Sequence, residues 1–335
     1  MRQSPVNIKL SAMLLLGHAQ PFYSMTWVTI EPMLLKFKKL KIDGWQLIGI
    51  IGALAGLGLF AIRPSFPTPD KLIIFLIFVF MAWHQARDML RRLGPFLAII
   101  LVYESFRGWA HSLNDHVNYS LAPSFDRWLF GDLPTKYLQD WWWSGRTRWH
   151  DVLLYTPYMF YFIAPFALAI LIWKTRLGHY WQVITAYSLL YLGAFMTYFA
   201  FPAAPPWLAA QDQVIEPVTR VSSEVWASLG IKDFPSVYNV IAANPVAAVP
   251  SLHAGASTLF CLLIFKFYGW RWGSLAALYP LLIYIGTVYE GEHYFFDIVT
   301  GAAYGIAAFL SAPWATRRLM SGYKLIMRKH ESFKT

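Results

Sequence analysis

Long apolar runs separated by short polar segments recur along most of this 335-residue chain. A helix that spans a membrane needs about 20 mostly apolar residues, and fewer where its end residues reach the interface. The pattern therefore predicts an all-α fold, a polytopic membrane bundle of helices with about eight spans. The expected spans are 45–62, 71–90, 95–111, 150–173, 180–201, 252–268, 272–289 and 293–314.

The spans suggest four parts with different tasks. A basic segment that lies in the cytoplasm or on the membrane surface comes first, followed by two accessory spans, a six-span core and a basic tail. The expected boundaries are 1–44, 45–94, 95–314 and 315–335.

The distribution of Lys and Arg predicts the orientation. Eight spans place both termini on one side, and that side holds 19 of the 28 Lys and Arg but only 4 of the 18 acidic residues. Basic residues mark cytoplasmic segments. We therefore expect an integral protein of a bacterial inner or plasma membrane with cytoplasmic termini. The two long loops, 112–149 and 202–250, then lie outside the cytoplasm.

The composition supports a membrane protein. Apolar residues make up 57% of the chain and charged residues only 14%, whereas soluble domains carry about 25% charged residues. The net charge of +10 is explained by the orientation, so no nucleic-acid partner is expected. Cys261, the single cysteine, lies in an apolar run and permits no intramolecular disulfide.

Two polar segments at helix ends carry the candidate chemistry. The segment 248–255 contains His253, and the segment 289–297 contains His293 and Asp297. About two spans and one tight turn separate them, so the chain returns to the membrane face that it left. We expect these three side chains to share one site on the extracytoplasmic face.

Each residue type in this set has a chemical use. Asp297 lies four residues after His293, so on a helix its carboxylate can fix one ring nitrogen and leave the other as a nucleophile or base. Pro250 and Ser251 are typical helix-start residues, and the free N–H groups of a first turn favour a bound phosphate. Together they suit cleavage of a phosphoester without a metal or cofactor. Histidine and aspartate at helical spacing can also ligate zinc, but no HExxH motif or nearby cysteine supports that alternative.

The sequence PSLHAG, followed by GEHYFFDIVTG, resembles the second and third signature motifs of the type 2 phosphatidic acid phosphatase superfamily. Within it, the chain is most similar to the branch of inositol phosphorylceramide synthases and sphingomyelin synthases. The segment FPAAPPW, residues 201–207, resembles the proline-rich segment of the inositol phosphorylceramide synthases. The resemblance covers roughly 95–314.

This resemblance implies roles for three residues. His293 attacks phosphorus and forms a phosphohistidine, Asp297 orients His293, and His253 protonates the leaving group and then deprotonates the acceptor. The motifs also differ from those of the phosphatases, because Leu252 precedes the first histidine and an uncharged residue at or near Thr287 replaces an arginine.

The phosphate therefore needs a cation from elsewhere. Our candidate is Arg107, at the outer end of the third span, although an ion pair with Glu104 or an interfacial anchor explains it equally well. Ser251 and Glu292 are further candidates for phosphate binding, and Glu292 can instead cap a helix.

Three functions are consistent with these residues. The first is a lipid phosphotransferase that passes a head group from a phospholipid donor to a lipid hydroxyl. The second is an extracytoplasmic phosphatase that uses water as the acceptor and a lipid phosphate or polyprenyl diphosphate as substrate. The third is a non-enzymatic lipid-binding or transport protein. The sequence names neither the head group nor the oligomeric state.

Overall fold

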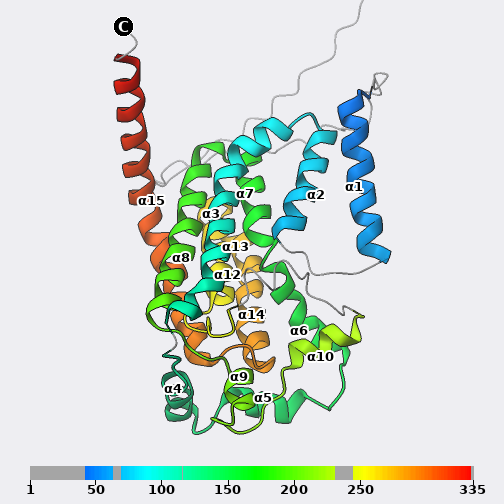
Figure 1. Cartoon of the computed structure of the whole chain (residues 1–335), viewed down its shortest axis with the longest axis vertical. Helices are drawn as coiled ribbons and strands as arrows, with labels where there is room; N and C mark the ends of the chain where they lie inside the picture. The colour runs from blue at the N-terminus through cyan, green and yellow to red at the C-terminus, as the bar shows by residue number, and fades with distance from the viewer. Residues whose placement is uncertain (1–41, 63–68, 115, 231–243, 333–335) are drawn as a thin grey trace, which may run out of the picture. The chain divides into compact units, whose positions relative to one another are not determined.

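The computed structural model describes residues 42–62, 69–114, 116–230 and 244–332. Every regular element within these ranges is a helix, which confirms the predicted all-α fold (Figure 1). The longer helices are α1 (Gly44–Ile62), α2 (Pro69–Ala82), α3 (Ala86–Leu113), α6 (Trp149–Phe160), α7 (Ala164–Thr175), α8 (Tyr180–Ala200), α12 (Leu252–Tyr268), α14 (Leu278–Tyr289) and α15 (Phe295–Ser332). The shorter ones are α4 (Leu121–Phe130), α5 (Pro134–Trp142), α9 (Pro206–Gln211), α10 (Val221–Ser228) and α13 (Trp270–Ala276), with a 3₁₀ turn η1 (Leu177–His179). Nearly all of the expected basic segment, 1–44, lies outside the described residues.

Several described helices have the length and composition of membrane spans, so this is an integral membrane protein. Four such helices are found, at Gly44–Ile62, Leu177–Ala200, Trp270–Tyr289 and Phe295–Gly322. A fifth results if α6 and α7, which are bent by 55° relative to each other, form one broken span. The total of eight spans stays a prediction.

The observed helix ends differ from the expected ones in three places. The expected span 71–90 is wrong, because α2 ends at Ala82 and α3 begins at Ala86, with His84 between them at a φ of 56°. The expected span 150–173 bends between α6 and α7, where Pro165 lacks the N–H that would continue the helix. The last helix does not end at 314 but continues to Ser332. Hydropathy reports the membrane-embedded part of a helix rather than its ends.

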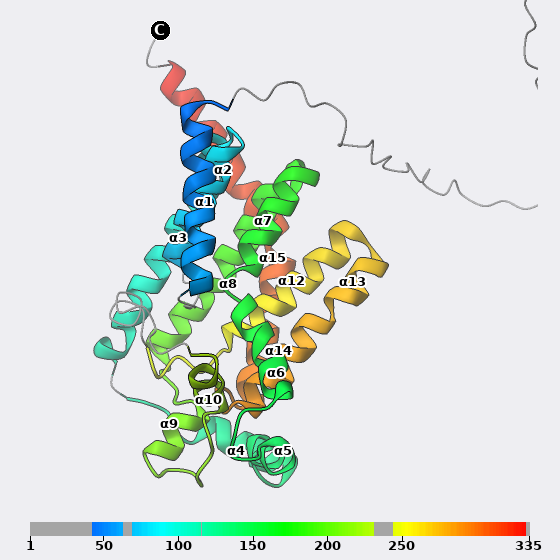
Figure 2. The same cartoon turned by 90° about the vertical axis from the view of Figure 1, so that its right-hand side faces the viewer.

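The hydrophobic core lies among α3, α7, α8, α12 and α15. Phe96 of α3 packs against Phe166 and Tyr187, and Leu259 and Ala312 are fully buried in the same cluster. The pattern of apolar residues on all sides of α8 is typical of a helix inside a bundle. The core therefore holds α8 and α12 in the middle of the long helices (Figures 1 and 2).

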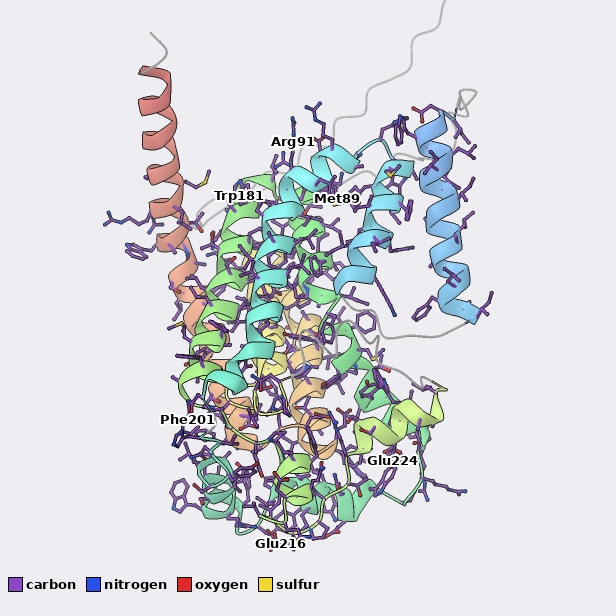
Figure 3. All side chains as sticks on the ribbon, in the orientation of Figure 1. Met89, Arg91, Trp181, Phe201, Glu216 and Glu224 are labelled. Atoms are coloured by element: carbon purple, nitrogen blue, oxygen red, sulfur yellow. The ribbon has the colours of Figure 1, made fainter. Side chains whose placement is uncertain are left out.

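Short helices gather at one end of the long helices. There, α4 packs on α15 and α5 on α14, and α9 and α10 lie close by (Figures 1 and 2). Glu216 and Glu224 lie at this end, while Met89 and Arg91 lie at the other (Figure 3). The expected long loops, 112–149 and 202–250, thus contain helices that cover the end at which α12 and α15 begin.

The backbones of α12 and α15 touch at three glycines. A Cβ atom added to Gly301 would lie 2.1 Å from the carbonyl oxygen of Ser251, and one added to Gly305 would lie 2.4 Å from that of Gly255. Gly301 and Gly305 form a GxxxG pattern, which lets membrane helices approach closely. No larger residue fits without moving one helix away from the other.

We predict that Gly301→Ala destabilises the protein by about 1–3 kcal/mol, because the added methyl group overpacks this contact. Thermal unfolding of the purified protein in detergent measures the effect. Gly322→Ala on the same helix is the matched control, because a Cβ there meets nothing within 4 Å. Alanine favours a helix by about 1 kcal/mol over glycine, so the control keeps or gains stability. An equal response of both variants would contradict the proposed packing.

Candidate active site

The histidines of the two polar segments contact each other. His253 lies in the first turn of α12, where Ser251 is the N-cap residue, while His293 lies in the turn between α14 and α15. Nδ1 of His253 and Nε2 of His293 are 3.2 Å apart, within hydrogen-bond distance. The side chain of His293 is buried. The structure thus brings together segments that are 40 residues apart in the sequence.

Asp297 holds the other nitrogen of the His293 ring. Its Oδ2 lies 3.3 Å from Nδ1 of His293 and accepts a hydrogen bond from the N–H of Tyr294 at 2.9 Å. The expectation that both residues share a helix is wrong in detail, because α15 begins at Phe295 and His293 precedes it. A proton on Nδ1 leaves a lone pair on Nε2, directed at His253. This arrangement suits a nucleophilic Nε2 with a proton carrier beside it.

Two tyrosines enclose the ring of His253. Tyr158 stacks on it with ring centroids 4.2 Å apart and an angle of 21° between the planes. Tyr161 contacts it at 4.5 Å with an angle of 49°. Aromatic contacts of this kind contribute about 0.5–1.5 kcal/mol each. They fix the plane in which Nδ1 of His253 meets His293.

Backbone hydrogen bonds hold the start of α12. The proline-rich segment, 201–207, contributes through Ala203, whose N–H donates to the carbonyl of Val246 at 2.8 Å and whose carbonyl accepts from Ala248 at 3.2 Å. The N–H of Ser251 donates to the carbonyl of Asp297 at 3.0 Å. Its Oγ accepts the N–H of Ala254 at 3.3 Å, so this oxygen caps α12. A contact of Ser251 with phosphate stays a prediction.

Asp126 of α4 caps the start of α15. Its two carboxylate oxygens accept the N–H groups of Phe295 at 2.8 Å and Phe296 at 3.0 Å. The side chain is fully buried. Burial raises the pKa of Asp126 to about 6, although these two hydrogen bonds lower it. Asp126, which lies in an expected loop, therefore fixes the helix start that follows His293. No residue near Asp126 in the sequence indicates this pairing.

The turn that precedes His293 is held on several sides. Gly291 has a φ of 75°, and a Cβ on it would lie 2.9 Å from the carbonyl of Thr219. Gln139 of α5 donates to the carbonyls of Thr219 at 2.7 Å and Tyr289 at 2.8 Å. The N–H of Trp207 also donates to the carbonyl of Gly291 at 3.1 Å. These contacts tie both outer segments to the turn.

Glu292 binds an arginine that the sequence analysis did not identify. Arg220 donates from Nε to Oε1 of Glu292 at 2.8 Å and from Nη2 to Oε2 at 3.3 Å, and Ser222 donates to the same carboxylate. The guanidinium carbon of Arg220 lies 4.1 Å from the centre of the Trp207 ring. Arg107, the predicted cation, belongs to α3, and its side chain lies outside the described part of the chain. Within the described residues, no group of three or more His, Cys, Asp and Glu side chains is arranged to hold a metal ion.

Glu290, beside this turn, is a buried carboxylic acid. It is fully buried, and neither carboxylate oxygen has a hydrogen-bond partner among the described residues. Burial raises its pKa well above the usual value, and the nearby carboxylates of Glu292 and Asp151 raise it further. Glu290 therefore carries a proton in the folded protein at pH values where an exposed glutamate is ionised.

We predict that Glu290→Gln removes part of the pH dependence of stability. A carboxyl with a raised folded pKa contributes stability that is complete below its unfolded pKa, near 4.5, and is lost as the pH rises through the folded value. Relative to wild type, the unfolding temperature of the variant should therefore increase as the pH is raised. Glu224→Gln, at an exposed position of α10, is the control and should show a constant difference. A constant difference for Glu290→Gln would contradict the prediction.

Curated relatives match part of the chain. The Phosphoinositol dihydroceramide synthase of Bacteroides thetaiotaomicron is 31% identical over 150 residues, 42% of this chain and 48% of the relative. The Inositol phosphorylceramide synthase catalytic subunit AUR1 of Saccharomyces cerevisiae is 24% identical over 223 residues, 64% of this chain and 54% of the relative. The Inositol phosphorylceramide synthase of Candida albicans is 27% identical over 207 residues, 58% of this chain and 41% of the relative. The chain spans about half the length of the curated relatives it matches.

A family model agrees with the motifs. No solved structure matches significantly. The model described as "PAP2 superfamily" matches residues 123–311, a range that contains both histidine segments and more than half of the chain. The relatives carry names from the branch that the motifs resemble. The chain belongs to the PAP2 superfamily.

Proposed function

We propose that this protein is a lipid phosphotransferase that moves a phosphorylated head group from a phospholipid to a lipid hydroxyl through a phosphohistidine at His293. The observation that carries the proposal is the chain of contacts from Asp297 to Nδ1 of His293 and from Nε2 of His293 to His253. It supplies an oriented nucleophile with a proton carrier beside it. The names of the relatives support phosphoinositol as the head group and a ceramide as the acceptor.

The first half-reaction cleaves the donor. The phosphodiester enters beside Nε2 of His293 and replaces the hydrogen bond to His253. The Nε2 lone pair attacks phosphorus, and the bond between phosphorus and the diacylglycerol oxygen breaks. His253 donates a proton to that oxygen, so diacylglycerol leaves as a neutral alcohol. Asp297 stabilises the positive charge that develops on the His293 ring.

The second half-reaction restores the enzyme. His253, now neutral, accepts the proton of the acceptor hydroxyl while the hydroxyl oxygen attacks phosphorus. The phosphorus–nitrogen bond breaks, its electron pair returns to His293, and the product is a phosphorylated lipid. Water at the acceptor position would give hydrolysis instead, so the exclusion of water determines which reaction occurs.

The expected placement in the membrane fits this reaction. The excess of Lys and Arg at the termini supports cytoplasmic termini and an extracytoplasmic site in a bacterial inner or plasma membrane. The site lies where α12 and α15 begin, next to α4 and α5. Residues 95–314 then form the catalytic core, with the two helices before it as accessory spans.

We predict that His293→Ala and His253→Ala each reduce transfer at least about 1,000-fold, because each residue performs a chemical step. Asp297→Asn should reduce it about 100-fold or more, because the amide disturbs the His293 tautomer. The assay uses the full chain in detergent with a phosphoinositol phospholipid and a ceramide, and mass spectrometry identifies the lipid products. His179→Ala, at an exposed position, is the matched control and should retain activity.

Two outcomes would contradict this proposal. Full activity of His293→Ala would remove the histidine mechanism. Release of the free phosphorylated head group, without a new phospholipid, would identify a phosphatase with water as its acceptor.

A further inference from the structure

The two candidate catalytic segments contain no lysine or arginine of their own. Neither 248–255 nor 289–297 includes Lys or Arg. In phosphoryl transfer the oxygens around phosphorus carry negative charge, and enzymes stabilise it with fixed cationic donors. The first turn of α12 offers N–H groups and His253 gives up its proton to the leaving group, so a lasting cation must come from another part of the chain.

Arg220 is bound directly to the second segment. Glu292, its partner at 2.8 Å, is the residue before His293. Among the described side chains, Arg220 is the one Lys or Arg that forms a salt bridge with either catalytic segment. The nearby cations of α4 and α5 pair elsewhere, because Arg127 binds Glu216 and Lys136 binds Asp132, each at 2.8 Å.

Arg220 also lies near a residue that packs on the other histidine. Arg220 interacts electrostatically with Tyr158, and Tyr158 stacks on His253 at 4.2 Å. Arg220 therefore lies beside both halves of the site. Its salt bridge with Glu292 joins it to the residue before His293, and its electrostatic interaction with Tyr158 places it near the tyrosine that stacks on His253.

The guanidinium is held in place and, among the described residues, keeps donors that no hydrogen bond uses. A guanidinium has five N–H groups, and Nε and Nη2 each use one on Glu292. Trp207 covers one of its faces at 4.1 Å, and Gln139 donates to the carbonyl of Thr219, the residue before Arg220, at 2.7 Å. The side chain is still 42% exposed. Because its position is already fixed, binding of an anion loses little further side-chain entropy.

We propose that Arg220 binds the phosphoryl group during transfer, using the N–H groups that do not contact Glu292. Glu292 and Trp207 are then positioning residues that hold the guanidinium. This inference rests on the proposed function, since it names the cation of the same site. The ligand is the phosphodiester of the donor lipid and the phosphoryl group as it passes to His293. Lysine cannot replace arginine fully, because it lacks the planar set of donors.

The test compares Arg220 variants by transfer activity, inhibition by orthovanadate, and thermal unfolding. Arg220→Gln should reduce transfer about 100-fold or more, the range found when one fixed donor to a transition state is removed. Its inhibition constant for orthovanadate should rise at least tenfold. Arg220→Lys should fall between wild type and Arg220→Gln in both measurements. Arg220→Ala should regain part of its activity when guanidinium is added at millimolar concentration.

Arg127→Gln is the matched control. Its side chain is 38% exposed and also forms a salt bridge at 2.8 Å, with Glu216, so the same change in charge and size is made without removing the contact to Glu292. It should keep the transfer rate and vanadate inhibition of wild type. Guanidinium rescue of Arg220→Ala distinguishes phosphate binding from a purely structural role, because free guanidinium cannot restore a misfolded loop.

Two results would overturn the inference. In one, Arg220→Gln keeps the vanadate inhibition of wild type while His293→Ala is inactive. In the other, Arg220→Gln and Arg220→Lys lose activity only in proportion to their loss of folded protein, with no rescue by guanidinium. If His293→Ala itself retains activity, the proposed function fails instead, so the two failures are distinguishable.

Discussion

The close approach of the α12 and α15 backbones is the constraint on which the site depends. Gly255, Gly301 and Gly305 leave no side chain between the helices. The carbonyl of Asp297 therefore accepts the N–H of Ser251 at 3.0 Å, which joins the two helix starts directly. His253 follows one start and His293 precedes the other. Any residue that separated these helices would also separate the two imidazole rings, both of which the proposed transfer uses.

The two outer segments complete the site with three polar side chains. Asp126 of α4 caps α15, Gln139 of α5 fixes the turn before His293, and Arg220 binds Glu292. Each contact acts on the backbone or side chain beside the catalytic residues. The segments that hydropathy assigns to loops are therefore part of the framework that positions the candidate catalytic residues.

Local sequence signals explain which features could be predicted. The limits of α12 match the expected 252–268, because Ser251 caps its start and Gly269, with a φ of 82°, ends it. His253, His293 and Asp297 stand out by motif and spacing. The strongly apolar part of the expected span 71–90 stops near Trp83, but hydropathy alone does not show that the helix breaks at His84. Arg220 and Asp126 could not be predicted, since their partners lie 72 and at least 169 residues away, and no pattern in one sequence reports such pairing.

The covalent intermediate at His293 is the central claim, and it can be measured directly. Purified protein is mixed with the phospholipid donor in the absence of acceptor, quenched at alkaline pH and digested for mass spectrometry. The account predicts that the peptide containing His293 gains the mass of one phosphorylated head group, and that added acceptor lipid removes it. An adduct on His253 instead, or rapid turnover with no adduct on His293, would contradict the account.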